Sequence, residues 1–401
     1  MGILTRTAGL LSLVALPIYL AVAAPIGNLD TEAAASKRIL ELQTRYQQNV
    51  LASISNRTSG CTAQNIQHRR EWYVHAHPTL PPETRASFIS AIHCLNELPA
   101  RTPSSVAPGA RKLYDDFIVT HIQQTPFVHA SGLFLPFHRH LLHLFSLALR
   151  DPRCDGGGYD GPLPYWDWTA SYTDPRAAAV FDPADPYSLG GNGEFVPNRN
   201  GTVIGLPGGR SKTIPAATGG GCVQTGPFRK GAFEVRLGPV GYEPRGPQGG
   251  MGYNPRCLTR DLSPEFSYGT RPSAVMGLMD GCGGELGCFV EEMDAPGGVP
   301  GGVHASGHWQ VGLDALDVYA SPADPVFWLH HAQVDRVWAI WQGQDVSGRT
   351  YQVWGTETSG NDPPSDNVTL ETAMDFGVLG EMRTIGDVSS TVDGEYCYLY
   401  E

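Results

Sequence analysis

Two groups of histidines constrain this 401-residue chain more than any other feature of its sequence. An HxxxH pair places two imidazoles one helical turn apart on the same face, where both can reach one ion. Burying several imidazoles side by side costs free energy unless each ring is bonded to something. The pattern therefore predicts a metal centre between helices. The histidines concerned are His121, His129 and His138 in the first group and His304, His308, His330 and His331 in the second.

The predicted ligand set contains imidazole only, because no Cys, Asp or Glu lies at ligand spacing within either group. Such a set suits copper, zinc, iron or nickel, and copper is favoured by intrinsic affinity. A structural zinc site fits less well, since such sites are closed by four ligands. The histidines also share helix faces with apolar side chains, as His121 does with Phe117. A lone histidine would more simply be a satisfied core residue, but this number on apolar faces favours a metal.

Composition narrows the possible partners and the fold. Lys and Arg number 28 against 40 Asp and Glu, so the chain carries a formal charge of −12 and attracts neither nucleic acid nor an anionic membrane surface.

Gly (48) and Pro (32) are more numerous than a bundle with short loops needs, which predicts long ordered loops. Helical spacing predicts helices near residues 40–50, 83–98, 115–124, 136–150 and 330–342 and around His304. Residues 152–303 are predicted to form loops, short strands and turns.

The N-terminus has the features of a secretory signal. Arg6 is followed by an apolar run that ends in small residues near Ala23. Residues 1–23 are therefore predicted to be a signal peptide, and residues 24–401 a single secreted, extracellular domain without a membrane segment after cleavage. The N-glycosylation sequons at Asn56, Asn200 and Asn367 fit a secreted glycoprotein.

Secretion also changes how the eight cysteines are interpreted. An even number of cysteines in an oxidising compartment suggests disulfides, although the sequence does not choose their pairing. Cys282 and Cys288 are close enough in sequence to close a small loop. Cys397, near the C-terminus, is expected to fix the tail by a disulfide.

The segments around the histidines resemble those of a known family. The sequence FLPFHR at residues 134–139, preceded by His129, resembles the copper-A motif of tyrosinases and catechol oxidases. The sequence DPVFWLHHAQVDR at residues 324–336, preceded by His304 and His308, resembles their copper-B motif. The copper-A region covers residues 111–151 and the copper-B region residues 300–345. The closest likeness is to short secreted fungal catechol oxidases and tyrosinase-like enzymes.

The resemblance implies a mainly α fold in which a four-helix bundle holds a dinuclear copper site, with long Gly/Pro-rich loops and few short strands. No C-terminal lid domain is expected. His330 would support the site without binding metal, and Asp335 would steady a copper-B imidazole through its second ring nitrogen. The ligands implied are His121, His129 and His138 for copper A, and His304, His308 and His331 for copper B.

The family activity implied is the oxidation of o-diphenols, and possibly of o-aminophenols, to o-quinones with dioxygen. Ala305 stands where some relatives carry Asn, and Ala295 where they carry Glu, so monophenol hydroxylation is expected to be weak or absent. Phe127 replaces a cysteine that is cross-linked to the second copper-A histidine in many relatives. Trp309 either borders the substrate entrance or packs in the core. The alternatives are a true tyrosinase, a biosynthetic oxygenase for one specific phenol, or a haemocyanin-like oxygen-binding protein.

Overall fold

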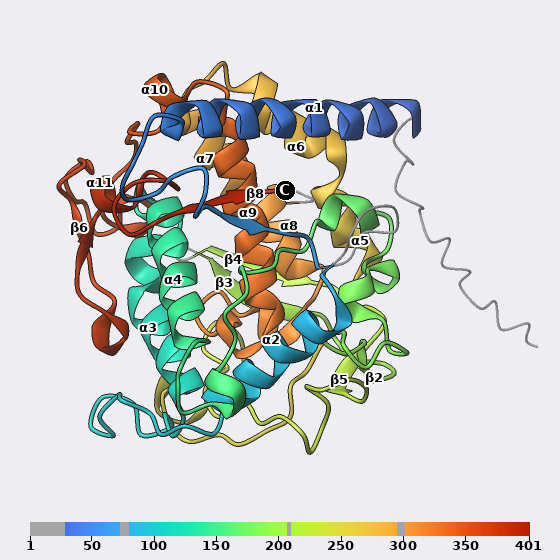
Figure 1. Cartoon of the computed structure of the whole chain (residues 1–401). Coiled ribbons are helices and arrows are strands. Elements are labelled where there is room, and N and C mark those ends of the chain that lie inside the picture. Colours follow the sequence, from blue (N-terminus) through green and yellow to red (C-terminus); the bar gives the residue numbers. More distant parts are fainter. Residues whose placement is uncertain (1–28, 73–79, 207–209, 295–300) are drawn as a thin grey trace, which may run out of the picture.

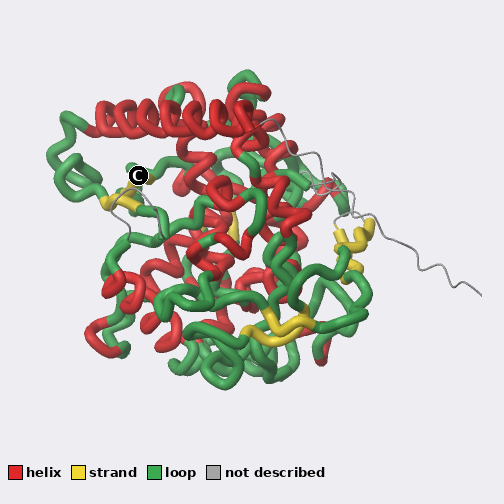
Figure 2. Tube along the Cα trace, turned by 90° about the vertical axis from the view of Figure 1, so that its right-hand side faces the viewer, coloured by secondary structure: helices red, strands yellow, loops and turns green. Residues whose placement is uncertain are grey.

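The computed structural model describes residues 29–72, 80–206, 210–294 and 301–401, so the predicted signal peptide lies outside the described residues. Most of the regular structure is helical, with short strands and long loops towards the periphery (Figures 1 and 2). The helices are α1 (Leu29–Ile54), α2 (Pro82–Leu95), α3 (Leu113–Val128), α4 (Phe134–Ala148), α5 (Pro264–Ser267), α6 (Pro272–Gly281), α7 (Leu286–Asp294), α8 (Val303–Trp309), α9 (Val326–Gly343), α10 (Val346–Arg349) and α11 (Ile385–Val388).

The central helix is α9, which is buried over its whole length of 18 residues. It contacts α1, α4 and α8 and lies in the middle of the molecule in Figure 1. Aromatic packing fixes it against α4, where Phe145 stacks on Trp328 with ring centroids 3.7 Å apart. A helix buried on every side is typical of the core of a larger protein, and α9 provides a rigid base for the histidines it carries.

The strands form four two-stranded pairs within the described residues. One pair is parallel and joins segments from opposite ends of the chain, with His68 opposite Leu399. The β3–β4 hairpin is antiparallel, with Ile204 opposite Lys212. The strands are β1 (Gln67–Arg69), β2 (Gly193–Phe195), β3 (Thr202–Leu206), β4 (Arg210–Ile214), β5 (Gly220–Val223), β6 (Ala373–Met374), β7 (Arg383–Thr384) and β8 (Tyr398–Tyr400).

The prediction of a mainly helical fold with few short strands is confirmed, and the loop-rich region is only partly as expected. Residues 152–263 consist of short strands, short 3-10 turns and loops, but residues 264–294 contain α5, α6 and α7. The sequence gives little signal for these helices because they are short and two of them contain an internal glycine, Gly277 in α6 and Gly287 in α7, which lowers helix propensity. Among the described residues, no helix is both long and apolar enough to cross a bilayer.

Every cysteine is paired in the structure, in four disulfides. The predicted small loop is confirmed by the Cys282–Cys288 bond, and Cys397 fixes the C-terminal segment to Cys61, as expected. The remaining pairs are Cys94–Cys154 and Cys222–Cys257.

A buried polar network fastens the C-terminal strand to the central helices. Asp335 on α9 accepts hydrogen bonds from Nε of Arg139 (2.6 Å) and from the hydroxyls of Tyr398 (2.7 Å) and Tyr400 (2.6 Å). The Arg69 guanidinium lies 3.4 Å from the centroid of the Tyr398 ring. Burial acts to raise the pKa of Asp335, but the neighbouring guanidinium groups of Arg139 and Arg69 hold it below its ordinary value.

Candidate metal centre

Three buried histidines meet between α3 and α4. His121 lies on α3, His129 ends that helix, and His138 lies on α4. One nitrogen of each ring lies within 4.8 Å of the others, and Nε2 of His138 is 3.4 Å from Nε2 of His121. The structure therefore assembles the first predicted group as one cluster.

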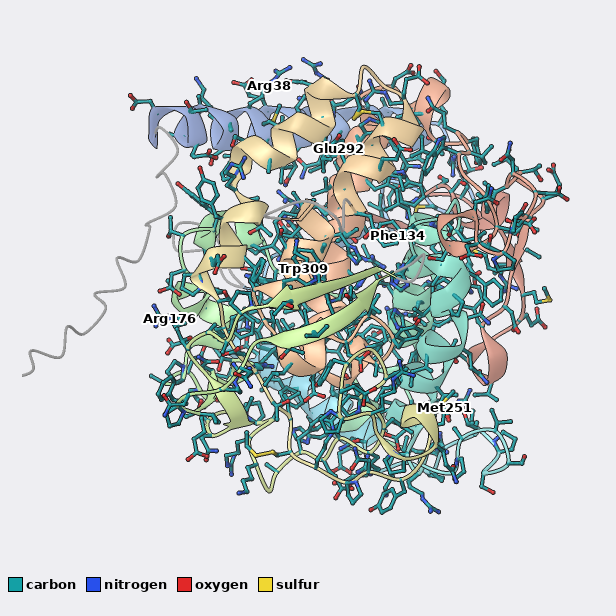
Figure 3. The ribbon with its side chains drawn as sticks, turned by 180° about the vertical axis from the view of Figure 1, so that it is seen from behind. Arg38, Phe134, Arg176, Met251, Glu292 and Trp309 are labelled. Carbon is teal, nitrogen blue, oxygen red and sulfur yellow. A yellow bond between two sulfur atoms is a disulfide. The ribbon has the colours of Figure 1, made fainter. Side chains whose placement is uncertain are left out.

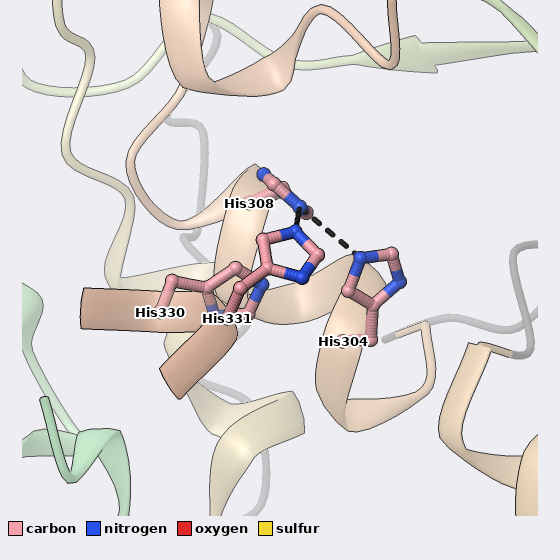
Figure 4. Close-up of side chains that lie close together, drawn as sticks. All are labelled: His304, His308, His330 and His331. Atoms are coloured by element: carbon pink, nitrogen blue, oxygen red, sulfur yellow. Dashed lines mark hydrogen bonds between the residues drawn. The ribbon is translucent and has the colours of Figure 1, made fainter. Parts of the chain in front are cut away.

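The second group is assembled by α8 and α9 (Figure 4). His304 and His308 lie one turn apart on α8, and His331 lies on α9. Nε2 of His308 is 3.1 Å from Nε2 of His304 and 3.2 Å from Nε2 of His331. His330 lies in the same cluster, with a ring nitrogen within 4.8 Å of the other three.

The two clusters adjoin one another. The rings of His138 and His331 are stacked with centroids 4.3 Å apart, and those of His129 and His304 are 6.2 Å apart. The two groups thus form one continuous arrangement of imidazoles, which fits a binuclear metal site.

The second ring nitrogen of five of the six candidate ligands is held by an oxygen of the protein. Such a bond fixes the tautomer with the proton on Nδ1, so the lone pair of Nε2 points into the cluster. The partners of Nδ1 are the carbonyl of Tyr319 for His121 (2.7 Å), of Thr125 for His129 (3.4 Å), of Phe134 for His138 (2.7 Å) and of Ala315 for His308 (2.8 Å), and the carboxylate of Asp294 for His304 (2.7 Å).

This arrangement leaves acceptor atoms facing one another. When Nδ1 carries the proton, the Nε2 atoms of His304 and His308 have only lone pairs to offer, and they lie 3.1 Å apart. Burial lowers the pKa of His308 well below its ordinary value, so protonation of this ring does not relieve the repulsion. A cation bound between the Nε2 atoms would relieve it. The residues present therefore fit metal ions, and the all-imidazole donor set fits copper or zinc.

The role expected of Asp335 is corrected by the structure. Its carboxylate bonds to Arg139, Tyr398 and Tyr400, whereas Nδ1 of His331 has no hydrogen-bond partner among the described residues. Residues four apart on a helix lie on neighbouring positions, but here the guanidinium and phenol groups compete successfully for the carboxylate. Asp335 therefore fastens the fold and does not orient a ligand.

The residue that does orient an imidazole is Asp294, at the end of α7. Its Oδ1 lies 2.7 Å from Nδ1 of His304, and its Oδ2 accepts a hydrogen bond from the backbone N–H of Ala130 (3.1 Å). Burial acts to raise the pKa of Asp294, but the bond to His304 holds it below its ordinary value. The sequence offered only a weak signal for this role, namely several acidic residues shortly before the HxxxH pair.

His330 differs from the six candidate ligands in the partner of its Nδ1, which accepts a hydrogen bond instead of donating one. Trp168 Nε1 donates a hydrogen bond to Nδ1 of His330 (3.1 Å). The His330 ring also packs against Gly307 on α8, where a Cβ atom would lie 2.1 Å from Cε1 of His330. The glycine between His304 and His308 is thus required for this close approach.

A small cavity of about 40 Å³ opens beside the second group. Its wall includes both residues that the sequence placed near the substrate, Ala305 and Trp309. Trp309 is 4% exposed and also packs edge-on against Phe266, with centroids 5.5 Å apart. Trp309 is therefore packed in the core and also borders this cavity. The predicted acid position, Ala295, lies outside the described residues.

Comparison with known proteins agrees with this geometry. Residues 111–344 match the family model described as the common central domain of tyrosinase. The chain is 38% identical to tyrosinase P of Aspergillus terreus over 351 aligned residues. This alignment covers 85% of this chain and 93% of the relative. It is 37% identical over 362 residues to the N-acetyl-6-hydroxytryptophan oxidase of Emericella nidulans, covering 85% of this chain and 94% of the relative.

A solved structure shows the same architecture. A mutant of the polyphenol oxidase from Thermothelomyces thermophila superposes with a TM-score of 0.82 at 38% identity, covering 91% of this chain and 98% of that one. The chain therefore belongs to the tyrosinase family. It is an oxidase of the polyphenol oxidase type, and its two histidine groups fit the dinuclear copper site of that family.

Proposed function

We propose that this chain is a secreted dicopper oxidase that uses dioxygen to convert o-diphenols to o-quinones, and o-aminophenols of similar shape to the corresponding o-quinone imines. The observation that carries the proposal is the convergence of Nε2 atoms in two adjoining groups whose Nδ1 atoms are already bonded to the protein. The ligands would be His121, His129 and His138 for one copper, and His304, His308 and His331 for the other.

Two coppers held there would pass two electrons from each diphenol to dioxygen, so that two diphenols and one dioxygen give two quinones and two waters. The protein's own contribution is to hold the six rings in position and to enclose the reacting atoms. Ala305 and Trp309 give the cavity an apolar wall on which an aromatic ring can pack. His330 supports the second group through its bond to Trp168.

Weak monophenol hydroxylation is part of the proposal. A monophenol must lose its proton before it binds as a phenolate, and a nearby base or hydrogen-bonding group helps that step. Ala305 offers only a methyl group, and both oxygens of Asp294 are engaged by His304 and Ala130. Within the described wall of the cavity, no carboxylate oxygen is left to take the proton.

Secretion is supported by the chemistry of the chain. Four disulfides persist most readily in an oxidising compartment. The three sequon asparagines, Asn56, Asn200 and Asn367, are all exposed and so accessible to glycosylation. The relative named for oxidation of N-acetyl-6-hydroxytryptophan supports a second candidate, in which the substrate is one specific phenolic intermediate of a biosynthetic route.

The proposal is tested by measuring copper per chain and the optical spectrum after addition of hydrogen peroxide, followed by assays with catechol, 2-aminophenol and tyramine. We expect two coppers, an intense near-ultraviolet band, turnover of the first two compounds and little hydroxylation of tyramine. Zinc alone, or one copper without the band, would contradict the dicopper centre. Rapid tyramine hydroxylation without a priming diphenol would favour a true tyrosinase, and reversible oxygen binding without catechol turnover would favour an oxygen carrier.

A further inference from the structure

A groove of about 730 Å³ lies beside the candidate metal centre. Asp294 lines both this groove and the small cavity described above. The rest of its described wall comes from α7, from the turn between α3 and α4, and from residues 353–368. Figure 3 labels Glu292 on α7 and Phe134 at the start of α4, and it shows the segments that follow α9, in faint red, beside α4. Three separate parts of the chain therefore meet at the groove, next to the histidines.

The 353–368 segment holds the turn between α3 and α4. The N–H of Gly360 donates a hydrogen bond to the carbonyl of Ala130 (2.8 Å), and the N–H of Gly132 donates one to the carbonyl of Thr356 (3.0 Å). Ala130 has a φ of +47°, which residues other than glycine rarely adopt, so its conformation depends on such contacts. The segment therefore helps to keep the histidine at the end of α3 in position.

The wall of the groove combines an aromatic face with polar groups. Trp354 provides a half-buried indole, and Thr356, Asn361 and Glu291 provide groups that donate or accept hydrogen bonds. The described residues of the wall include no lysine, arginine or histidine, so the groove does not favour an anion. A sugar presents hydroxyl groups at its edge and apolar C–H groups on its face, and both find partners on such a wall.

One asparagine of the wall can itself carry a carbohydrate. Asn367 is followed by Val368 and Thr369, which completes an N-glycosylation sequon, and it is exposed. It lines the groove, and it forms an antiparallel bridge with Thr356 within the 353–368 segment. An N-glycan on Asn367 would therefore begin at the wall of the groove.

We propose that Asn367 carries an N-glycan whose first sugars lie in this groove and hold the 353–368 segment against the turn between α3 and α4. The inference rests on the secretion included in the proposed function, because N-glycans are added in the secretory pathway. The sugars cover the indole of Trp354 and join the segment to α7 through Glu291. Without them the segment is held by its own hydrogen bonds alone, and it opens more often.

The modification is a group transfer without oxidation or reduction. The donor is a lipid-linked diphosphate oligosaccharide of the secretory pathway. A bond forms between Nδ2 of Asn367 and C1 of the first sugar, while the bond from that carbon to the diphosphate oxygen breaks. The lipid diphosphate leaves with the bonding electrons, and Nδ2 gives up one proton.

The first test measures how fast an endoglycosidase releases each glycan from the full chain secreted by a eukaryotic host. Mass spectrometry of glycopeptides follows Asn367 and, as controls on the same chain, Asn56 and Asn200. In the native protein we expect release at Asn367 to be at least about tenfold slower than at the controls, because the endoglycosidase must wait for the groove to open. After denaturation the rates should be the same.

The second test removes the glycan and measures hydrogen exchange. Asn367→Gln keeps the side-chain amide but abolishes the sequon, and Thr369→Ala abolishes it without changing the asparagine. In both variants we expect the backbone amides of residues 130–132 and 355–360 to exchange about threefold to tenfold faster than in the wild type. Thr369→Ser retains the sequon and Asn200→Gln removes a sequon elsewhere, so both should exchange at the wild-type rate.

Three results would overturn the inference: no sugar on Asn367 when the other sequons carry it, equal release at all sites of the native protein, or unchanged exchange in Asn367→Gln and Thr369→Ala. The release measurement needs no variant, so it decides the question even if a substituted chain is not secreted. Absence of sugar from all three asparagines would contradict secretion, and with it this inference. Sugar on Asn56 and Asn200 alone would contradict only the site at Asn367.

Discussion

Asp294 and His304 form a carboxylate–imidazole pair at the wall of the candidate metal centre, with Oδ1 2.7 Å from Nδ1. The pair joins the end of α7 to α8 across ten positions of sequence. The carboxylate fixes the orientation of the ring and makes Nε2 a better donor to a metal. Because the other oxygen of Asp294 binds the N–H of Ala130, the same side chain also positions the segment that follows His129.

Replacing this carboxylate should therefore weaken metal binding without removing a ligand. For Asp294→Asn we expect a loss of about tenfold to hundredfold in copper affinity, the usual effect of losing a partner of a metal-bound imidazole. The measurement is competition for copper against a chelator of known affinity. Glu292→Gln, at an exposed position on the same helix, is the control. Equal affinities in the two variants would show that the Asp294–His304 pair does not support metal binding.

Removing a candidate ligand should lower the number of copper ions bound per chain. Nε2 of His308 contacts the Nε2 atoms of both His304 and His331, so His308→Ala is expected to lower copper from two ions per chain towards one and to abolish catechol oxidation. Copper is measured by elemental analysis of the purified protein. The control is His68→Ala, a half-exposed histidine that bonds to Glu401 on the surface. Full copper content in His308→Ala would exclude this histidine as a ligand.

The buried network around Asp335 should matter for stability. Its carboxylate is 3% exposed and pairs with the buried Arg139, so Asp335→Asn leaves an uncompensated guanidinium and should cost about 3–5 kcal/mol of unfolding free energy. Asp393 pairs with Arg57 at 41% exposure, and Asp393→Asn should cost less than about 1 kcal/mol. Urea unfolding monitored by tryptophan fluorescence measures both. Similar losses in the two variants would mean that burial does not distinguish these pairs.

The carboxylate of Asp335 should also make the free energy of unfolding depend on pH. The pKa of Asp335 in the folded protein is below its ordinary value, so its stabilising contribution is fully present above the unfolded-state pKa of about 3.9 and is lost as the pH falls through the folded value. The stability difference between wild type and Asp335→Asn should therefore be constant between about pH 5 and pH 8 and shrink below about pH 4. A difference that grows on acidification would contradict the depressed pKa.

The disulfides should differ in how much they contribute to the free energy of unfolding. Cys61 and Cys397 are 336 positions apart, whereas Cys282 and Cys288 are 6 apart. In the chain-entropy model, closing the longer loop stabilises the fold by about 6 kcal/mol and the shorter by about 2 kcal/mol. Paired Cys→Ala variants compared by urea unfolding test this order. The reverse order would indicate that native-state strain or residual structure outweighs loop entropy.

The sequence was most informative where a periodic pattern coincided with unusual chemistry. His121 and His138 could be placed on buried helix faces because apolar residues recur around them at helical spacing, and the two groups were brought together as expected. Asp294 could not be assigned, because its contact with His304 depends on how the loop between α7 and α8 returns, which local spacing does not encode. The partners of Asp335 could not be predicted for a related reason, because its carboxylate is bonded by arginine and tyrosine side chains distant in sequence.

The short helix α8 limits how sequence variation can alter this enzyme. Two of its residues, His304 and His308, face the metal centre, and Gly307 accommodates the ring of His330 with no room for a side chain. Val303 and Ser306 are buried. Ala305 and Trp309 are buried too, but they line the cavity, so substitutions there would change the space beside the centre. A mutant library aimed at new substrates therefore needs to vary only these two positions of the helix, because substitutions at the other positions would disrupt the metal centre.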